Sequence, residues 1–142
     1  MKKMIYQVYT GKQSNLYDHC IASVAAYTKR IGAEHVVQRE PILKIMPDTK
    51  VTNRSVESYS KHGGFLPIYE KENAFGYLDR YDQIAIIDAD IYIRDAAPSI
   101  FSEIKADVDF AAVVERDMPI DKKYKNKIRA YSSAQYRRLE KE

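Results

Sequence analysis

Two aspartates separated by one residue, Asp88 and Asp90, have the residue type and spacing that most directly suggest chemistry in this sequence. They follow a short apolar run at residues 84–87 that is rich in β-branched side chains. Such a run predicts a central strand, buried on both faces, in a parallel sheet. Ligands of open α/β sheets bind beyond the carboxyl ends of the strands. The sequence therefore predicts a pair of carboxylates at a binding edge.

A divalent metal ion is the simplest partner for this pair. Two carboxylates so close together repel each other unless a cation lies between them. Ligands that are all oxygen favour Mg²⁺, Mn²⁺ or Ca²⁺ over the metals that prefer Cys and His. We interpret Asp88 and Asp90 as metal ligands. The alternative is a solvated turn, in which Asp88 caps the next element and Asp90 points to water.

The segment at residues 81–101 resembles the Asp-x-Asp segment of nucleotide-sugar glycosyltransferases of the GT-A fold. Tyr81 and Asp82 come before the apolar run, and Asp88-Ala89-Asp90 follows it. A second apolar run at residues 91–93 then leads to Ala-Pro-Ser-Ile-Phe at residues 97–101. The closest likeness is to the glycogenin and bacterial galactosyltransferase group, the eighth glycosyltransferase family. The resemblance implies a Rossmann-like sheet and a transferase that uses a nucleotide-diphosphate sugar, with a UDP-sugar as the expected donor.

The resemblance also implies roles for individual residues. Asp88 and Asp90 would bind Mn²⁺ or Mg²⁺, with Asp90 as the first choice for direct ligation. The further residues implied in nucleotide-sugar binding are Val8, Tyr9 and Thr10 at the end of the first strand, Tyr17 as a stacking ring, Lys71 beside the phosphates, and Asp88 and Ala89 beside the ribose. Tyr17 as helix surface and Lys71 as a surface lysine are the structural alternatives.

One part of the family pattern is missing. Those enzymes complete the metal site with a later histidine, and they build the acceptor pocket from a second half of the sheet. This sequence has no histidine after His62. The expectation is therefore the N-terminal nucleotide-binding half alone, with an unknown acceptor. Three alternatives follow: the enzyme is truncated or fragmentary, a second copy or another chain supplies the acceptor half, or the protein binds without transferring.

Two functions of other classes remain open. In a phosphatase of the haloacid dehalogenase type, the leading aspartate of such a pair attacks phosphate while a metal screens the charge. Those enzymes place the motif at their first strand, which differs from its position here. A nucleotide-binding or assembly module without turnover is the other alternative, because the site looks incomplete.

Composition sets broad limits. The 142 residues, 45% hydrophobic and 30% charged, predict a soluble globular protein. No apolar run is long enough to predict a membrane span, and the single Cys20 allows no internal disulfide, so we expect a cytoplasmic protein. The net charge of +3 is small. A basic tail from Arg116 suggests a solvated helix or a phosphate-bearing partner, and we expect no nucleic acid partner.

The elements that must position these residues alternate along the chain. Periodicity, caps and breakers predict strands at residues 4–9, 35–38, 84–87, 91–93 and 109–114. They predict helices at residues 15–31, 53–60 and 65–78, a helix from Asp95 or Pro98 to residue 104, and a charged helix at residues 121–142. This order predicts an α/β domain at residues 1–114 with a mainly parallel sheet. Residues 115–142 would be a basic extension of the same domain.

Overall fold

The computed structural model describes residues 1–46, 65–105, 107–112 and 119–139. The chain divides into two compact units, Met1–Glu103 and Ile104–Glu142, which are described separately. The predicted helix at residues 53–60 and His62 lie outside the described residues.

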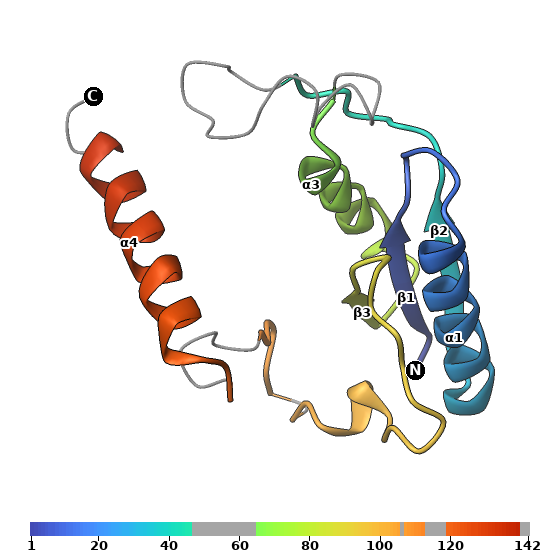
Figure 1. Ribbon diagram of the computed structural model, residues 1–142. Helices are drawn as coiled ribbons and strands as arrows, with labels where there is room; N and C mark the ends of the chain where they lie inside the picture. The colour runs from blue at the N-terminus through green and yellow to red at the C-terminus, as the bar shows by residue number, and fades with distance from the viewer. Residues whose placement is uncertain (47–64, 106, 113–118, 140–142) are drawn as a thin grey trace. The chain divides into compact units, whose positions relative to one another are not determined.

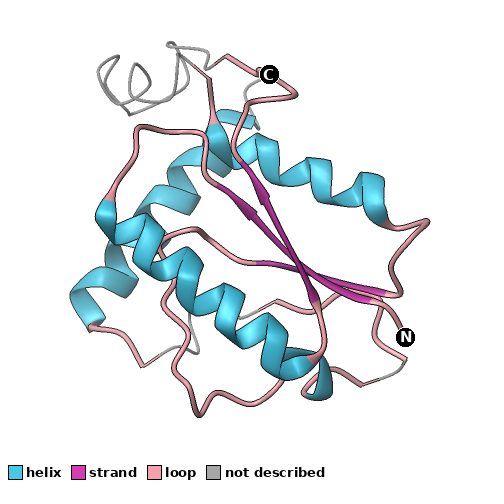
Figure 2. Ribbon diagram, turned by 90° about the vertical axis from the view of Figure 1, so that its right-hand side faces the viewer, coloured by secondary structure: helices cyan, strands magenta, loops and turns pink. Residues whose placement is uncertain are grey.

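The first unit is built on a parallel sheet of three strands. These are β1 (Lys3–Val8), β2 (Glu34–Gln38) and β3 (Gln83–Ile86), in the order β2-β1-β3 (Figures 1 and 2). Tyr6 is in register with Val36 on one side and with Ile86 on the other. The carboxyl ends of all three strands therefore lie at the same edge of the sheet.

Helix α1 (Asn15–Ile31) covers one face of the sheet and is bounded as the sequence predicts. Ser14 precedes the helix in an extended conformation, and Gly32 ends it with a φ of 66° in the left-handed region, where glycine carries no steric penalty. The core under α1 joins Ile5 of β1 to Val24 and Tyr27 of the helix. Because β-strand side chains alternate between faces, Gln7 lies on the same side of β1 as Ile5, and Tyr9, which directly follows β1, packs against Ile21 of α1.

The opposite face of the sheet is covered by a mixed helix. A short α3 (Pro67–Glu70) continues into the 3₁₀ helix η1 (Lys71–Tyr77), and Pro67 stands in the first turn as expected. Met4 and Tyr6 of β1 pack there against Ala74. The observed class is α/β, with a small open parallel sheet and flanking helices, and this part of the prediction is confirmed.

The prediction of a central strand at residues 84–87 was wrong for the part of the sheet that the structure describes. That segment forms β3, which pairs only with β1 among the described strands, while β1 occupies the centre. Ile86 is 40% exposed, whereas Met4 and Ile5 are fully buried. The physical reason is that α1 and η1 cover both faces of β1, so β1 has the double burial that the apolar run suggested for β3.

The chain after the aspartates is less regular than predicted. Residues 91–93 form no strand, because the backbone N–H of Ile93 donates to the Ser23 hydroxyl of α1 at 3.0 Å instead of to a strand. Only Ile100–Ser102 is helical (η2), and the Ile100 N–H is held by the Tyr27 hydroxyl at 2.6 Å. Residues 109–112 are not a strand, and residues 113–114 lie outside the described part.

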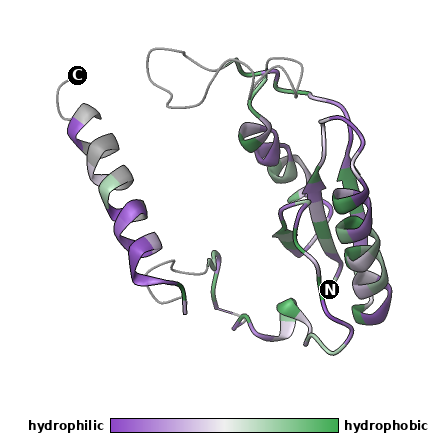
Figure 3. Cartoon of the chain, in the orientation of Figure 1, coloured by the Kyte–Doolittle hydropathy of each residue, from purple (hydrophilic) through white to green (hydrophobic). Residues whose placement is uncertain are grey.

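The second unit contains α4 (Lys122–Leu139), which confirms the predicted terminal helix. The Asp121 carboxylate accepts the backbone N–H groups of Lys123 at 2.7 Å and Tyr124 at 3.2 Å, as a helix-capping residue does. The first turns of α4 are strongly hydrophilic (Figure 3). Among the described residues, no helix has the length and apolar character needed to cross a membrane.

Candidate functional site

The two aspartates lie on a tight turn just beyond β3. The ladder between β1 and β3 continues one step past the strand, where the Ile87 N–H donates to the Tyr6 carbonyl at 3.0 Å. The turn is then closed by the Ile91 N–H, which donates to the Asp88 carbonyl at 3.1 Å. Asp88 and Asp90 are exposed, while Ala89 between them is 6% exposed. The turn therefore presents two carboxylates to solvent and anchors itself through the buried methyl group of Ala89.

Lys71 lies beside this turn. Its ammonium forms an ion pair with the Asp88 carboxylate, although the two residues belong to η1 and to the turn after β3. The Lys71 side chain is 31% exposed and that of Asp88 is 55% exposed, so both groups remain reachable from solvent. For Asp90, no hydrogen bond or ion pair is found within the part of the chain that the structure describes. Asp88 is thus charge-compensated, and Asp90 is available to a ligand.

An aromatic cluster adjoins the turn. Tyr9 and Ile21 are buried against Ala89. The Tyr17 ring packs on Tyr9 with 4.9 Å between centroids and an angle of 19° between planes, and the Tyr9 hydroxyl donates to the Lys12 carbonyl at 2.8 Å. Three residues assigned to nucleotide-sugar binding, Tyr9, Tyr17 and Ala89, therefore belong to one cluster. Tyr17 is half-buried, with one face committed to Tyr9.

Val8 and Thr10 do not join this cluster. Val8 packs with the core on the η1 side of the sheet, because it alternates with Tyr9 along β1. Thr10 is half-buried just after β1, at the same edge of the sheet as the turn.

Arg39 is a cation at this edge that the sequence analysis did not select. It follows β2 directly, and its guanidinium carbon lies 4.6 Å from the centre of the Tyr9 ring. One of its nitrogens lies 3.8 Å from the Asp18 carboxylate. The available signal was its position, since a basic residue directly after a strand of a parallel sheet lies at the ligand-binding edge.

Gln7 was also missed. It is fully buried in β1, and its amide nitrogen donates to the Asp88 carbonyl at 3.1 Å. Its amide oxygen lies 2.8 Å from Nε2 of His35, whose pKa is lowered by burial. The signal in the sequence was a polar residue in the middle of the strand predicted at residues 4–9, which must find hydrogen-bond partners when buried.

A second polar network surrounds the carboxylate of Glu70, the residue directly before η1. Glu70 is 1% exposed, and its carboxylate accepts the backbone N–H groups of Ile42 at 2.7 Å, Leu43 at 3.2 Å and Lys44 at 2.8 Å. Gln38 of β2 donates to the same carboxylate at 2.7 Å. Burial opposes ionisation of Glu70, but these hydrogen bonds outweigh it and hold its pKa below the usual value. This network fixes the residue that immediately precedes Lys71.

The donor set at the turn suits a hard divalent cation shared with phosphate groups. Within the described residues, no group of three or more His, Cys, Asp or Glu side chains could enclose a metal ion. Mg²⁺ is nevertheless commonly held by one or two carboxylates plus substrate phosphates, without an all-protein cage. Asp88 and Asp90 match that limited requirement. Asp88 would have to exchange its contact with Lys71 to serve as a ligand.

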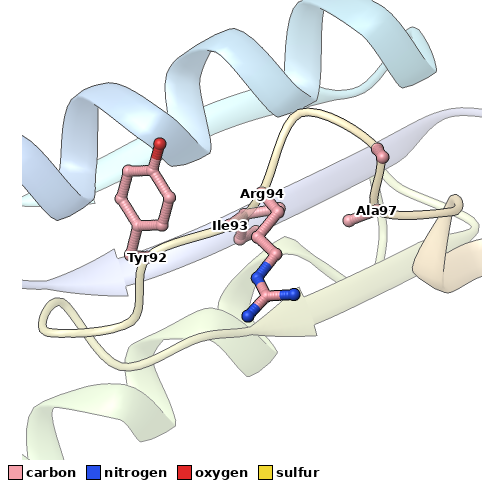
Figure 4. A pocket seen from close by; sticks show the side chains of 5 residues that line it. Tyr92, Ile93, Arg94 and Ala97 are labelled. Atoms are coloured by element: carbon pink, nitrogen blue, oxygen red, sulfur yellow. The ribbon is translucent and has the colours of Figure 1, made fainter.

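Two hollows follow the loop after the turn. One of about 510 Å³ is lined by Tyr92, Ile93, Arg94, Ala96 and Ala97, and another of about 220 Å³ lies between this loop and α1. In Figure 4 the side chains of Tyr92 and Arg94 point in different directions. Neither lining includes Asp88, Asp90 or Lys71. These hollows are therefore separate from the candidate site. The candidate site lies at the carboxyl edge of the sheet, where Lys71 and the two aspartates converge.

Comparison with known proteins gave no match to a family model, to a curated protein or to a solved structure.

Proposed function

We propose that this protein binds a nucleotide-diphosphate sugar, with a UDP-sugar as the expected ligand, and acts as the donor-binding half of a metal-dependent glycosyltransferase of GT-A type. One observation carries the proposal. Residues far apart in the sequence, Tyr9, Lys71 and Asp88, come together at the carboxyl edge of a parallel sheet. That edge is where α/β proteins bind ligands, and it combines aromatic rings, a cation and two carboxylates.

The chemistry of each group fits a part of such a ligand. Tyr17 offers aromatic surface to a base, since bases stack on aromatic rings, and the buried Tyr9 ring packs against Tyr17 and supports it. The Lys71 ammonium would offset negative charge on a diphosphate. Without a ligand, the ion pair with Asp88 holds this ammonium in place. Mn²⁺ or Mg²⁺ bound at Asp88 and Asp90 would stabilise the charge that develops on the departing diphosphate.

A binding module without turnover is the second candidate. It is favoured by the absence of a third acidic, His or Cys ligand near the pair among the described residues. In this proposal, transfer to an acceptor would require a surface that a second copy or another chain supplies.

The test is a titration of the 142-residue protein with UDP, UDP-glucose and UDP-galactose, with and without Mn²⁺, by calorimetry and thermal shift. We expect binding that requires Mn²⁺ and that weakens roughly tenfold or more in Asp90→Asn, because a carboxylate that contributes to metal binding has at least the effect of an outer-shell partner. Asp79→Asn is the matched control, since Asp79 is also exposed but lies before β3 and pairs with Arg80 at 3.8 Å. It should bind as the wild type does.

The outcomes separate the candidates. Binding accompanied by hydrolysis or transfer of the sugar favours the transferase, and binding without either favours the module. Release of phosphate from p-nitrophenyl phosphate that is lost in Asp88→Asn would instead indicate a phosphatase. Failure of the wild type to bind any of the three nucleotides in Mn²⁺ would overturn the proposal.

A further inference from the structure

A chain of hydrogen bonds crosses the sheet and ends at the aspartate turn. It begins at His35 on β2, passes through Gln7 on the central strand β1, and reaches the backbone carbonyl of Asp88 beyond β3. The distances are 2.8 Å and 3.1 Å. Gln7 has no exposed surface, so its amide has no water to replace these partners.

The direction of the chain follows from its last acceptor. A backbone carbonyl can only accept a hydrogen bond, so the Gln7 NH₂ group must face Asp88 and its oxygen must face His35. The Gln7 oxygen can only accept as well, so Nε2 of His35 must carry a proton. Burial lowers the pKa of His35, which favours the neutral ring. The neutral ring is therefore expected in the form protonated at Nε2.

The Asp88 carbonyl has two donors, and both shape the turn. The Ile91 N–H closes the turn from within at 3.1 Å, and Gln7 ties the same oxygen to the central strand. Asp88 and Asp90 follow the last ladder bond at Ile87, so no strand pairing holds them. Two buried contacts among the described residues fix the turn to the sheet: the methyl group of Ala89 packs on Tyr9, and Gln7 donates to the Asp88 carbonyl.

We propose that Gln7 is a positioning residue of the candidate site: by holding the Asp88 carbonyl, it sets the spacing and direction of the Asp88 and Asp90 carboxylates, and His35 fixes the orientation of the Gln7 amide. The expected effect of Gln7 on ligand binding rests on the proposed function. The structural part of the inference, the orientation of Gln7 and His35, is independent of any ligand.

The first test uses the wild-type 142-residue protein without ligand. The ¹⁵N chemical shifts of the two ring nitrogens identify which one carries the proton in neutral His35. We expect the proton on Nε2, and slow solvent exchange of the Gln7 side-chain NH₂ group. A proton on Nδ1 alone would overturn the proposal, because Gln7 would then turn its NH₂ group toward His35 and away from Asp88. This outcome is informative whether or not any variant folds.

The second test compares Gln7→Met, which keeps the length of the side chain but removes both hydrogen bonds, with Thr28→Val. Thr28 is 2% exposed and donates to the Ala25 carbonyl within α1, so its replacement also removes a buried polar group, away from the turn. We expect Gln7→Met to weaken Mn²⁺-dependent UDP binding at least tenfold and to shift the backbone amide signals of Ala89 and Asp90. Thr28→Val should change neither.

The two proposals fail in distinguishable ways. If the wild type binds UDP with Mn²⁺ and folded Gln7→Met binds within twofold of it, the positioning role is wrong and the proposed function stands. If the wild type does not bind but Gln7→Met shifts the signals of the turn and His35 is protonated at Nε2, the structural role stands and the proposed function is wrong.

Discussion

At the scale of single residues, Glu70 shows how a buried charge is made tolerable. An ionised carboxylate without partners would be costly at 1% exposure, but three backbone N–H groups and the side chains of Gln38 and Asn73 donate to it. The residue that follows it is Lys71. The placement of Lys71 therefore depends on this buried polar network around Glu70.

Glu70→Gln should lower the free energy of unfolding by about 3 kcal/mol at neutral pH, because a neutral amide loses charge-assisted hydrogen bonds and turns an NH₂ group toward buried donors. The difference should depend on pH. Since the pKa of Glu70 is lowered by folding, its contribution is present above the unfolded value of 4.5 and is lost as the pH falls through the folded pKa. Urea unfolding of both proteins between neutral and acidic pH measures this.

Glu72→Gln is the control for this pH dependence, because Glu72 stands on the same helical segment but is exposed. Its effect should stay within about 0.5 kcal/mol at every pH. Parallel pH profiles for wild type and Glu70→Gln would contradict the role given to the Glu70 carboxylate.

At the scale of elements, α1 and its end determine how the chain returns to the sheet. Gly32 adopts a φ of 66°, and its N–H and that of Ala33 both donate to the Thr28 carbonyl. This compact end allows β2 to begin at Glu34 and to pair in parallel with β1. The first βαβ connection therefore depends on a left-handed residue at one position.

Gly32→Ala should destabilise the protein by about 1 kcal/mol, which is the cost of a left-handed conformation for a residue with a Cβ atom. Apart from the residues next to it in the chain, no described residue has a heavy atom within 4 Å of the added Cβ, so the loss reports backbone conformation. Gly76→Ala is the matched control. Its added Cβ also meets open space, and its φ is not in the left-handed region, so stability should be unchanged or slightly raised. Equal effects of the two substitutions in thermal unfolding would refute this account.

At the scale of the whole molecule, the described sheet and the candidate site fall within one of the two units. Residues 1–103 contain the sheet, both helical layers and the turn with Asp88 and Asp90. This unit has thirteen Lys or Arg and thirteen Asp or Glu, so the net charge of +3 belongs to residues 104–142. Within α4, seven Lys or Arg residues stand without a single Asp or Glu.

A fragment of residues 1–103 should fold cooperatively, because its buried side chains contact one another and the three strands pack against helices on both faces. We expect a melting temperature within about 5 °C of the full chain, the shift that corresponds to about 1 kcal/mol for a unit of this size. Circular dichroism during heating measures it. A fragment without a thermal transition would show that residues 104–142 contribute to the fold of the first unit.

Much of the first unit could be predicted because its signals are local. The alternation in β1, the helical spacing and glycine end of α1, and Pro67 in a first turn each indicate an element from a few neighbouring residues. The turn with Asp88 and Asp90 followed from the apolar run before it. Predictions beyond that turn were wrong where partners distant in the sequence replaced regular pairing, as Ser23 does for Ile93 and Tyr27 does for Ile100.

The sequence by itself determined the types of most elements in the first unit, its α/β class and the placement of two carboxylates just after a strand. Only the tertiary structure decided that β1 is the central strand of the described sheet, that Lys71 pairs with Asp88, and that Gln7 holds the Asp88 carbonyl. The physical reason is the distance along the sequence over which each effect acts. Backbone propensity and periodicity act over a few residues, whereas strand order, burial and hydrogen-bond partners depend on which distant segments pack together.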